Sequence, residues 1–326
     1  MLPGGRPIGI DSFRKRYEEF FNVEIPSDQG LSLMEIIEGA HSRKIKALYV
    51  MGENVAFNIP DNKFVTEALS GLELMVVQDV FLTETAGYAH VVLPALSWAE
   101  KEGSYTNLEG RMQHLKKVIE GQGLEDWRIL GEISRMLGVD MKYSDPKDIL
   151  SEIAKVSPLH KGIDYEDMAG GQCMWPYKGE PLRHDINIEG IDLPDIRSLL
   201  KKPEYDKIYI GIDKPLFHSA SLSRNSSALN SISSGPYAKI GRGLADKLSI
   251  SDWDYISVST ASGSVELPVF VDADVPVNIV LVPNNFEGRG AFKVLSWKKN
   301  SIIKSPALDG NEVTLKKIER AAEVSA

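Results

Sequence analysis

Residues 47–54 read Ala-Leu-Tyr-Val-Met-Gly-Glu-Asn, and residues 75–79 read Met-Val-Val-Gln-Asp. Each is a short apolar run that ends in polar or turn-forming residues, which is the pattern of a buried strand followed by a turn. A third apolar run occupies 91–94, and a helical pattern at 61–70 separates the first two runs. This alternation predicts an open α/β sheet with parallel strands and right-handed crossovers.

Helical periodicity appears at three other places. Two helices are expected before the first strand, over 11–21 and 32–43, and the second begins with a capping box. A further helix is expected over about 126–137, with Gly138 placed to end it. We expect the first domain to end soon after this glycine.

The second half of the chain has a different pattern. From about 143 to 202, prolines and a glycine pair interrupt any long element, which indicates a connecting arm. Short strand-like runs follow at 208–210, 255–259, 265–271 and 278–282. Short strands separated by Gly, Asp and Pro turns predict a closed β-barrel.

The composition excludes several classes of function. The chain has 326 residues, a formal net charge of −9 and no dense basic stripe, which argues against a nucleic-acid-binding surface. Its longest apolar stretch, near 91–99, is far shorter than a membrane span. The N-terminus lacks the apolar core of a secretory signal. We therefore expect a cytoplasmic protein that reaches the inner face of a membrane only through partner subunits.

The single cysteine, Cys173, limits the redox chemistry of the chain. One cysteine permits no intrachain disulfide and no iron–sulfur cluster held by this chain alone. No adjacent His or Lys would lower the pKa of its thiol, so we expect no catalytic role for it. The six histidines are not at metal-ligand spacing, and the signatures of nicotinamide, kinase, zinc-protease and serine-hydrolase sites are missing. The sequence therefore assigns no catalytic residue and no metal ligand.

Polar side chains follow the first two predicted strands. Ligands of an open α/β sheet bind outside the carboxyl ends of its strands, and here those ends carry Glu53, Asn54, Gln78 and Asp79. Carboxylate and amide groups can bind ribose hydroxyls or purine nitrogens. The alternative is that Asn54 and Asp79 only satisfy backbone groups of their turns.

Three other features allow two interpretations each. Lys101 can contribute a point charge for a phosphate or can simply be solvated, and Asp126 can bind a ligand or only cap a helix. Residues 217–225, Phe-His-Ser-Ala-Ser-Leu-Ser-Arg-Asn, are dense in hydrogen-bonding groups. They suit an anion or a polar heterocycle, with a serine-rich turn as the alternative.

Several of these segments together resemble the molybdopterin oxidoreductases. The resemblance rests on residues 49–54, 77–86, 90–95 and 100–111. Within that superfamily the chain is most similar to the formate dehydrogenase α subunit and to the G subunit of bacterial NADH:quinone oxidoreductase, respiratory complex I. The opening Leu-Pro-Gly-Gly-Arg-Pro at 2–7 favours the formate dehydrogenase side. The resemblance is specific over about 1–140 and looser over about 205–300.

The resemblance implies a fold and a cofactor. The fold would be a Rossmann-like parallel-sheet domain at 1–142, a connecting arm at 143–204 and a double-psi β-barrel at 205–326. Together these would bind a bis(molybdopterin guanine dinucleotide) cofactor with Mo or W. The positions that match family contacts to its guanosine and phosphate parts are Glu53, Asn54, Gln78, Asp79, Thr83, Lys101 and Asp126 in the first domain, and His218, Ser221, Ser223 and Arg224 in the barrel.

The departures from the family imply a partner. Family members begin with a cysteine-bound iron–sulfur region and a domain that ligates the metal, and this sequence contains neither. It resembles the C-terminal half of a split subunit, whose iron–sulfur-bearing half and other electron-transfer subunits would be separate chains. Residues 282–292 lack the aromatic and Asn pattern of active enzymes, so the alternatives are a bound cofactor and a pterin site that has lost it, as in the G subunit of complex I.

Three functions therefore stay open at the level of the sequence. The first is a half-subunit that completes a molybdopterin-oxidoreductase fold in an electron-transfer complex and is not active alone. The second is part of a working Mo- or W-dependent formate dehydrogenase. The third is a stand-alone module that binds guanine nucleotides.

Overall fold

The computed structural model describes residues 2, 4, 6–169, 171, 173–176, 204, 206–218, 221–300, 304–308 and 311–319. The chain divides into two compact units. The first comprises Met1–Leu31, Gln78–Phe81 and Val92–Asp192, and the second comprises Ser32–Val77, Leu82–Val91 and Leu193–Ala326. Residues 177–203 of the expected connecting arm lie outside the described residues, as do positions 3 and 5 of the opening motif. The domain boundaries at 142 and 204 stay predictions.

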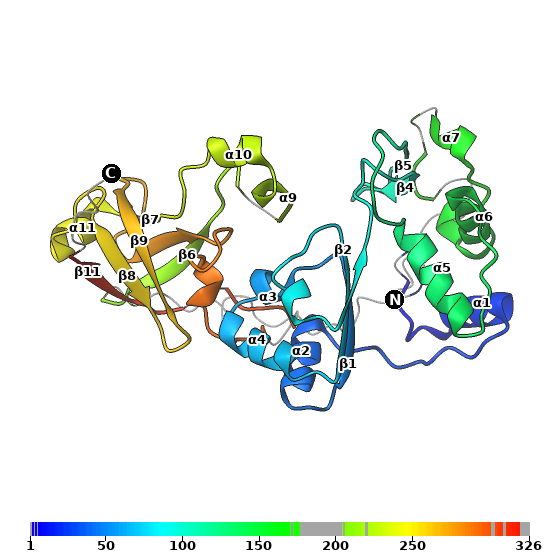
Figure 1. Cartoon of the computed structure of the whole chain (residues 1–326), viewed down its shortest axis with the longest axis horizontal. Coiled ribbons are helices and arrows are strands. Elements are labelled where there is room, and N and C mark those ends of the chain that lie inside the picture. Colours follow the sequence, from blue (N-terminus) through cyan, green and yellow to red (C-terminus); the bar gives the residue numbers. More distant parts are fainter. Residues whose placement is uncertain are drawn as a thin grey trace. The chain divides into compact units, whose positions relative to one another are not determined.

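The three strands expected near the start of the chain are present (Figure 1). They are β1 (Ala47–Met51), β2 (Leu74–Asp79) and β3 (Val91–Pro94), in the order β1-β2-β3. The helices before and between the first two strands are α2 (Leu33–His41), α3 (Val55–Asn58) and α4 (Asn62–Ser70). The capping box of α2 is confirmed, since Ser32 and Glu35 each accept a hydrogen bond from the other's backbone N–H.

One face of this sheet packs on helices in the second unit. Val50 of β1 and Met75 and Val77 of β2 are buried against Ile37 of α2 and Leu69 of α4. Successive side chains of a strand point to opposite faces, so the period-two burial follows directly from the sequence pattern. The last residues of β2 and β3 belong to the first unit.

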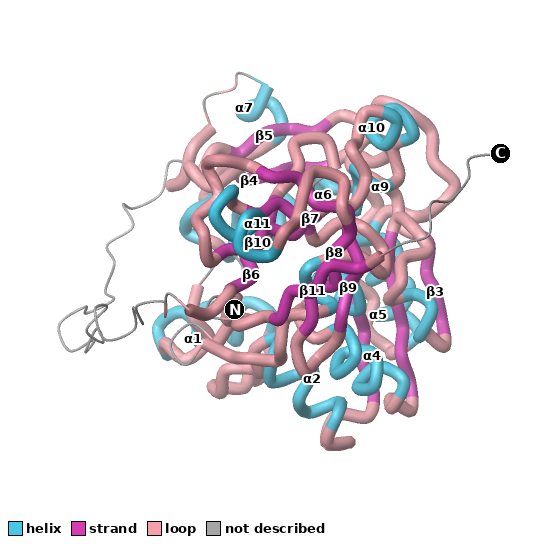
Figure 2. Tube along the Cα trace, turned by 90° about the vertical axis from the view of Figure 1, so that its left-hand side faces the viewer, coloured by secondary structure: helices cyan, strands magenta, loops and turns pink. Residues whose placement is uncertain are grey.

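The second unit also contains a mixed six-stranded sheet. Its strands are β6 (Tyr209–Asp213), β7 (Ala238–Ile240), β8 (Tyr255–Ser259), β9 (Ser264–Val271), β10 (Ile279–Pro283) and β11 (Thr314–Ile318). Their order is β11-β8-β9-β7-β10-β6, and Figure 2 shows β11, β8 and β9 side by side. The pairs β6·β10 and β7·β9 are parallel and the others are antiparallel.

The strands predicted in the second half are confirmed to within one residue, except that β6 ends three residues later than expected, and the chain is a mixed α/β protein with parallel and mixed sheets. The sheet order leaves β6 and β11 as edge strands, so these pairings do not form the expected closed barrel. A single antiparallel bridge joins Tyr209 of β6 to Glu312, two residues before β11. Helix α11 (Arg242–Leu248) and the short helices α9 (Ser221–Arg224) and α10 (Ser227–Ser231) connect the strands.

The first unit contains the remaining elements. They are α1 (Asp11–Phe21), the hairpin β4 (Gly103–Thr106) and β5 (Met112–Leu115), α5 (Asp126–Met136), α6 (Pro146–Val156) and α7 (Tyr165–Ala169). The predicted helix at 126–137 is confirmed, and Gly138 follows it with φ of +89°. Cys173 is buried in a small core with Leu150.

The expectation that prolines interrupt every long element after residue 143 is wrong for α6. Pro146 is the first residue of this helix of 11 residues, where a missing N–H costs nothing and the fixed φ suits the helix. Asp145 accepts a hydrogen bond from the Lys147 N–H at 2.7 Å, and Asp148 completes a capping box. The proline therefore starts the helix.

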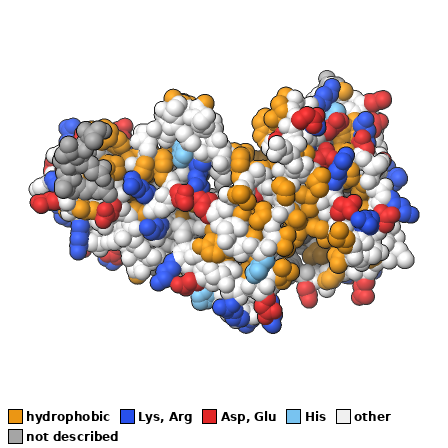
Figure 3. Space-filling model, in the orientation of Figure 1, with side chains coloured by type: hydrophobic (Ala, Val, Ile, Leu, Met, Phe, Trp, Pro, Cys, Tyr) orange, Lys and Arg blue, Asp and Glu red, His pale blue; other side chains and the backbone are white. Residues whose placement is uncertain are grey.

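Two global properties bear on function. None of the helices in the described part of the chain combines the length and the apolar character needed to cross a bilayer. Figure 3 shows Lys and Arg interspersed with Asp and Glu on the face in view, without a continuous basic surface there.

Asp61 ties α4 to distant segments of the second unit. Its Oδ1 accepts from the Phe64 N–H at 3.3 Å, and its Oδ2 accepts from Ser262 Oγ at 2.9 Å and from the Trp297 N–H at 3.1 Å. We predict that Asp61→Ala lowers the free energy of unfolding by about 2–3 kcal/mol, because it removes a helix cap and leaves the half-buried donors of Ser262 and Trp297 without this acceptor.

The measurement is urea denaturation of the full chain, with Asp61→Asn as the matched variant. Asp61 has φ of +59°, a left-handed conformation that Asn tolerates better than Ala. We expect Asn to cost about half as much as Ala. An Ala variant as stable as the wild type would refute this role of Asp61.

Candidate functional site

The residues predicted to contact a cofactor fall into two groups, one in each unit. The first unit holds Gln78, Asp79, Lys101 and Asp126. The second unit holds Glu53, Asn54, Thr83, His218, Ser221, Ser223 and Arg224. Each unit contains a hydrogen-bonded chain of three side chains: an amide, a carboxylate and a cation.

In the first unit this chain is Gln78, Asp126 and Lys101. Gln78 is fully buried at the end of β2, and its Nε2 donates to Asp126 Oδ1 at 2.7 Å. Asp126 is the first residue of α5, and its Oδ2 forms an ion pair with Lys101 Nζ. Because a buried amide without partners is costly, Gln78 fixes Asp126, and Asp126 in turn fixes the half-buried lysine. The structure thus brings together three predicted residues.

Asp79 and Glu53 accept hydrogen bonds from residues close to them in the sequence. Asp79 Oδ1 accepts from the Val80 N–H at 2.7 Å, which is the turn-satisfying role weighed for it in the sequence. Glu53 is exposed, and its Oε1 accepts from Asn58 Nδ2 at 2.8 Å.

In the second unit the chain is Asn54, Glu84 and Arg224. Asn54 follows β1 and is only 3% exposed. Its Nδ2 donates to Glu84 Oε2 at 2.7 Å, and its Oδ1 accepts from the Thr85 hydroxyl at 2.7 Å and from the Thr85 N–H at 3.2 Å. Asn54 therefore satisfies both a turn and a charged side chain.

Glu84 forms an ion pair with Arg224, which lies 140 residues later in the sequence. Arg224 Nη2 lies 2.6 Å from Glu84 Oε1, and the guanidinium carbon lies 4.0 Å from the centre of the Phe57 ring. Partial burial would raise the pKa of Glu84, but the hydrogen bonds from Arg224 and Asn54 hold it below its ordinary value. Glu84 was not among the predicted residues; its one signal is that it lies within the family-like stretch 77–86.

The remaining predicted residues of the second unit lie in different surroundings. His218 is buried, with Nε2 at 2.7 Å from the Asn285 carbonyl oxygen, Nδ1 at 3.1 Å from Asn230 Oδ1, and its ring stacked on Phe286. Both ring nitrogens thus bind protein oxygens that fix the loop. Thr83 Oγ1 is buried and has no hydrogen-bond partner within the described residues. The helix α9 begins at Ser221 and contains Ser223.

The sequence profile of the molybdopterin oxidoreductases matches residues 4–136. An F420-dependent formate dehydrogenase subunit alpha of Methanocaldococcus jannaschii is 32% identical, over 95% of this chain and 48% of that protein. Residues 4–136 of this chain therefore form a molybdopterin oxidoreductase family domain. The second G-type subunit of the NADH-quinone oxidoreductase of Rhizobium meliloti is 30% identical, over 88% of this chain and 33% of its own length.

Other comparisons agree on the family and on the fold. A probable oxidoreductase of Bacillus subtilis, YjgC, is 32% identical over 90% of this chain and 32% of its own length. The solved structure of acetylene hydratase from Pelobacter acetylenicus superposes with a TM-score of 0.68 over 95% of this chain and 50% of that one, at 16% identity, which shows the fold alone. This family member therefore spans between about a third and a half of these proteins. The family implies a molybdenum- or tungsten-pterin cofactor.

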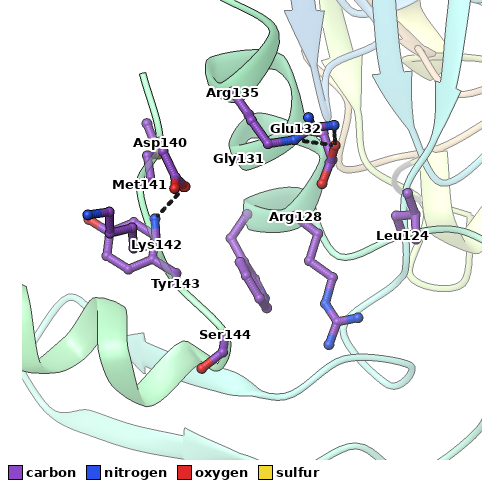
Figure 4. Close-up of a pocket in the computed structure, with 11 residues that line it drawn as sticks. Leu124, Arg128, Gly131, Glu132, Arg135, Asp140, Met141, Lys142, Tyr143 and Ser144 are labelled. Atoms are coloured by element: carbon purple, nitrogen blue, oxygen red, sulfur yellow. Dashed lines mark hydrogen bonds and ion pairs between the residues drawn. The ribbon is translucent and has the colours of Figure 1, made fainter. Parts of the chain in front are cut away.

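The first unit also has a cavity of about 560 Å³ beside α5 (Figure 4). Its walls include Arg128, Glu132 and Arg135 of α5, and Lys142 and Tyr143 of the following segment. Burial and a hydrogen bond to Glu152 raise the pKa of Tyr143 to about 12. None of the residues predicted to bind a cofactor lines this cavity.

The Arg224–Glu84 pair makes a testable contribution to stability. The pKa of Glu84 is lowered in the folded chain. The ion pair therefore makes its full contribution to folding stability at pH values above the ordinary carboxyl pKa of 4.5, and this contribution is lost as the pH falls through the folded pKa. We predict that Glu84→Gln lowers the free energy of unfolding by about 1–2 kcal/mol at pH 7. This difference should shrink as the pH falls below about 4.

Urea denaturation across this pH range measures the effect, and Glu287→Gln is the control. Glu287 lies 3.9 Å from Arg224 but is 76% exposed, so its loss should cost less than about 0.5 kcal/mol. Equal effects of the two variants would contradict the assignment of Glu84 as the partner of Arg224.

Proposed function

We propose that this chain is the C-terminal half-subunit of a molybdopterin-oxidoreductase-type electron-transfer complex. It completes the family fold and contributes side chains to the guanine dinucleotide part of a pterin site, and it carries no redox centre of its own. Electrons would pass through iron–sulfur centres of a partner chain that supplies the N-terminal half. The observation that carries the proposal is that relatives similar over 95% and 88% of this chain are a formate dehydrogenase subunit alpha and a G-type subunit of NADH-quinone oxidoreductase.

The donor set of each group suits a nucleotide. Lys101 and Arg224 are cations for phosphates, and Asn54 and Gln78 are amides suited to a purine or a ribose. The buried, unpartnered hydroxyl of Thr83 is a further donor or acceptor for a bound group. Both cations are paired with carboxylates in this structure, so a phosphate would have to take the place of Glu84 or Asp126. A bound molybdenum or tungsten pterin would supply all of the redox chemistry.

We further propose that β6–β11 correspond to the double-psi β-barrel of the family. Two hydrogen bonds beside the Tyr209–Glu312 bridge support this correspondence. The Ile210 N–H donates to the Asn311 carbonyl at 3.0 Å, and the Val313 N–H donates to the Ile208 carbonyl at 2.9 Å. They join residues 208–210 to residues 311–313, which immediately precede β11.

A second candidate function is part of a working formate dehydrogenase. The observation that favours it is the similarity to a formate dehydrogenase subunit alpha over 95% of this chain. In that case this chain and its partner would together close a catalytic molybdenum or tungsten site.

Affinity purification of the tagged chain from its native cell, with partner identification and analysis for Fe, Mo and W, tests the proposal. We expect a cysteine-rich partner that carries iron, because this chain has one cysteine and cannot hold a cluster itself. Stoichiometric Mo or W with formate-dependent dye reduction would favour the second function. A chain that purifies alone, without iron, would contradict both.

A further inference from the structure

A network of hydrogen bonds in the first unit is centred on a buried histidine. His160 ends the short 3-10 helix Pro158–His160 and is 8% exposed. Trp175 Nε1 donates to His160 Nε2 at 3.2 Å, and His160 Nδ1 lies 2.9 Å from Ser157 Oγ. Ser157 is also buried, and it hydrogen-bonds Tyr17 of α1. These four side chains, here called the His160 network, join α1, the end of α6 and residues 173–176.

Trp175 fixes the direction of the central hydrogen bond. An indole nitrogen can only donate, so His160 Nε2 must accept and carries no proton. The neutral histidine therefore keeps its proton on Nδ1 and donates it to Ser157. A second proton can enter His160 only at Nε2, the atom that accepts from Trp175. Protonation would thus set two N–H donors against each other and break this hydrogen bond.

The surroundings of the His160 network do not favour a positive charge on the ring. Burial lowers the pKa of His160. Its neutral form therefore stabilises the fold fully above the ordinary histidine pKa of 6.5, and this contribution is lost as the pH falls through the folded pKa. The titratable and charged side chains around the network are Tyr17, Arg6 and Arg16 at its far end, the buried Cys173 beside Trp175, and the exposed Lys155 and Lys161. None of them is a carboxylate that could accompany a protonated ring.

Trp175 also contacts the hairpin β4–β5. Its backbone N–H donates to the Gly110 carbonyl at 2.8 Å, and the Met112 N–H donates to the Cys173 carbonyl at 2.8 Å. The two segments pack closely, since a Cβ at Gly110 would lie only 3.2 Å from Trp175 Cβ. The hairpin begins two residues after Lys101 and carries most of the family-like stretch 100–111. The position of Trp175 therefore bears on this hairpin.

We propose that His160 is a pH-sensitive latch on residues 173–176. At neutral pH it accepts the indole N–H of Trp175 and so holds these residues against the hairpin β4–β5. In mild acid a proton from the solvent binds His160 Nε2, and the Trp175 side chain loses its acceptor. The backbone contacts of 173–176 with the hairpin then open more often. The latch lies within the first unit and does not depend on the proposed function.

Amide hydrogen exchange of the full chain, followed residue by residue by NMR, tests the latch. Protection factors, which correct for the intrinsic pH dependence of exchange, are compared between about pH 7.5 and about pH 4.5. We expect the protection of the Trp175 and Met112 amides to fall at least about fivefold in acid, as for the loss of one hydrogen bond. The amide of Ile37 in α2, which lies in the second unit, should change by less than about twofold.

Two variants separate the latch from other effects of acid. In His160→Gln the amide can accept from Trp175 and donate to Ser157 without titrating, so both amides should stay protected at both pH values. Trp175→Phe removes the N–H donor but keeps an aromatic ring. Its amide protection should already be low at about pH 7.5 and should fall no further in acid.

Several outcomes would overturn the latch. One is wild-type protection of Trp175 and Met112 that does not change with pH. Another is a loss in acid of the wild-type size in His160→Gln or in Trp175→Phe, and either variant decides this if the other fails to fold. An equal fall in protection at Ile37 would mean general unfolding in acid and would also refute it.

Discussion

The central constraint in this structure is that a buried amide must have its hydrogen bonds satisfied. Asn54 and Gln78 stand at the ends of β1 and β2 and are 3% and 0% exposed. Each donates to a carboxylate, and each carboxylate holds a cation: Glu84 holds Arg224, and Asp126 holds Lys101. The two units thus contain the same arrangement. In each, an amide at or after a strand end fixes a carboxylate, and the carboxylate fixes the position of a cation.

This arrangement explains why predicted binding residues are paired inside the protein. A guanidinium or ammonium that is half-buried costs free energy unless an anion accompanies it. In the folded chain that anion is a carboxylate, and on the proposed function it becomes a phosphate. The carboxylates would then serve to hold the cations in position until a ligand displaces them.

Local patterns in the sequence predicted much of the fold. The strands at 47–51, 74–79 and 255–259 and the helix at 126–136 follow from apolar periodicity and helix caps. The start of α6 at Pro146 was missed because a proline can begin a helix as well as interrupt one. Glu84 was missed because its partner lies 140 residues away, and no local pattern encodes such a pairing.

The chain spans between about a third and a half of the relatives it matches, and we propose that a partner chain supplies the rest of the fold. The most direct test of the account is native mass spectrometry of the assembly purified through this chain. The account predicts one copy of the chain bound to one copy of a polypeptide that matches the part of the relatives missing here. A monomer or a homodimer of the chain at cellular concentration would contradict it.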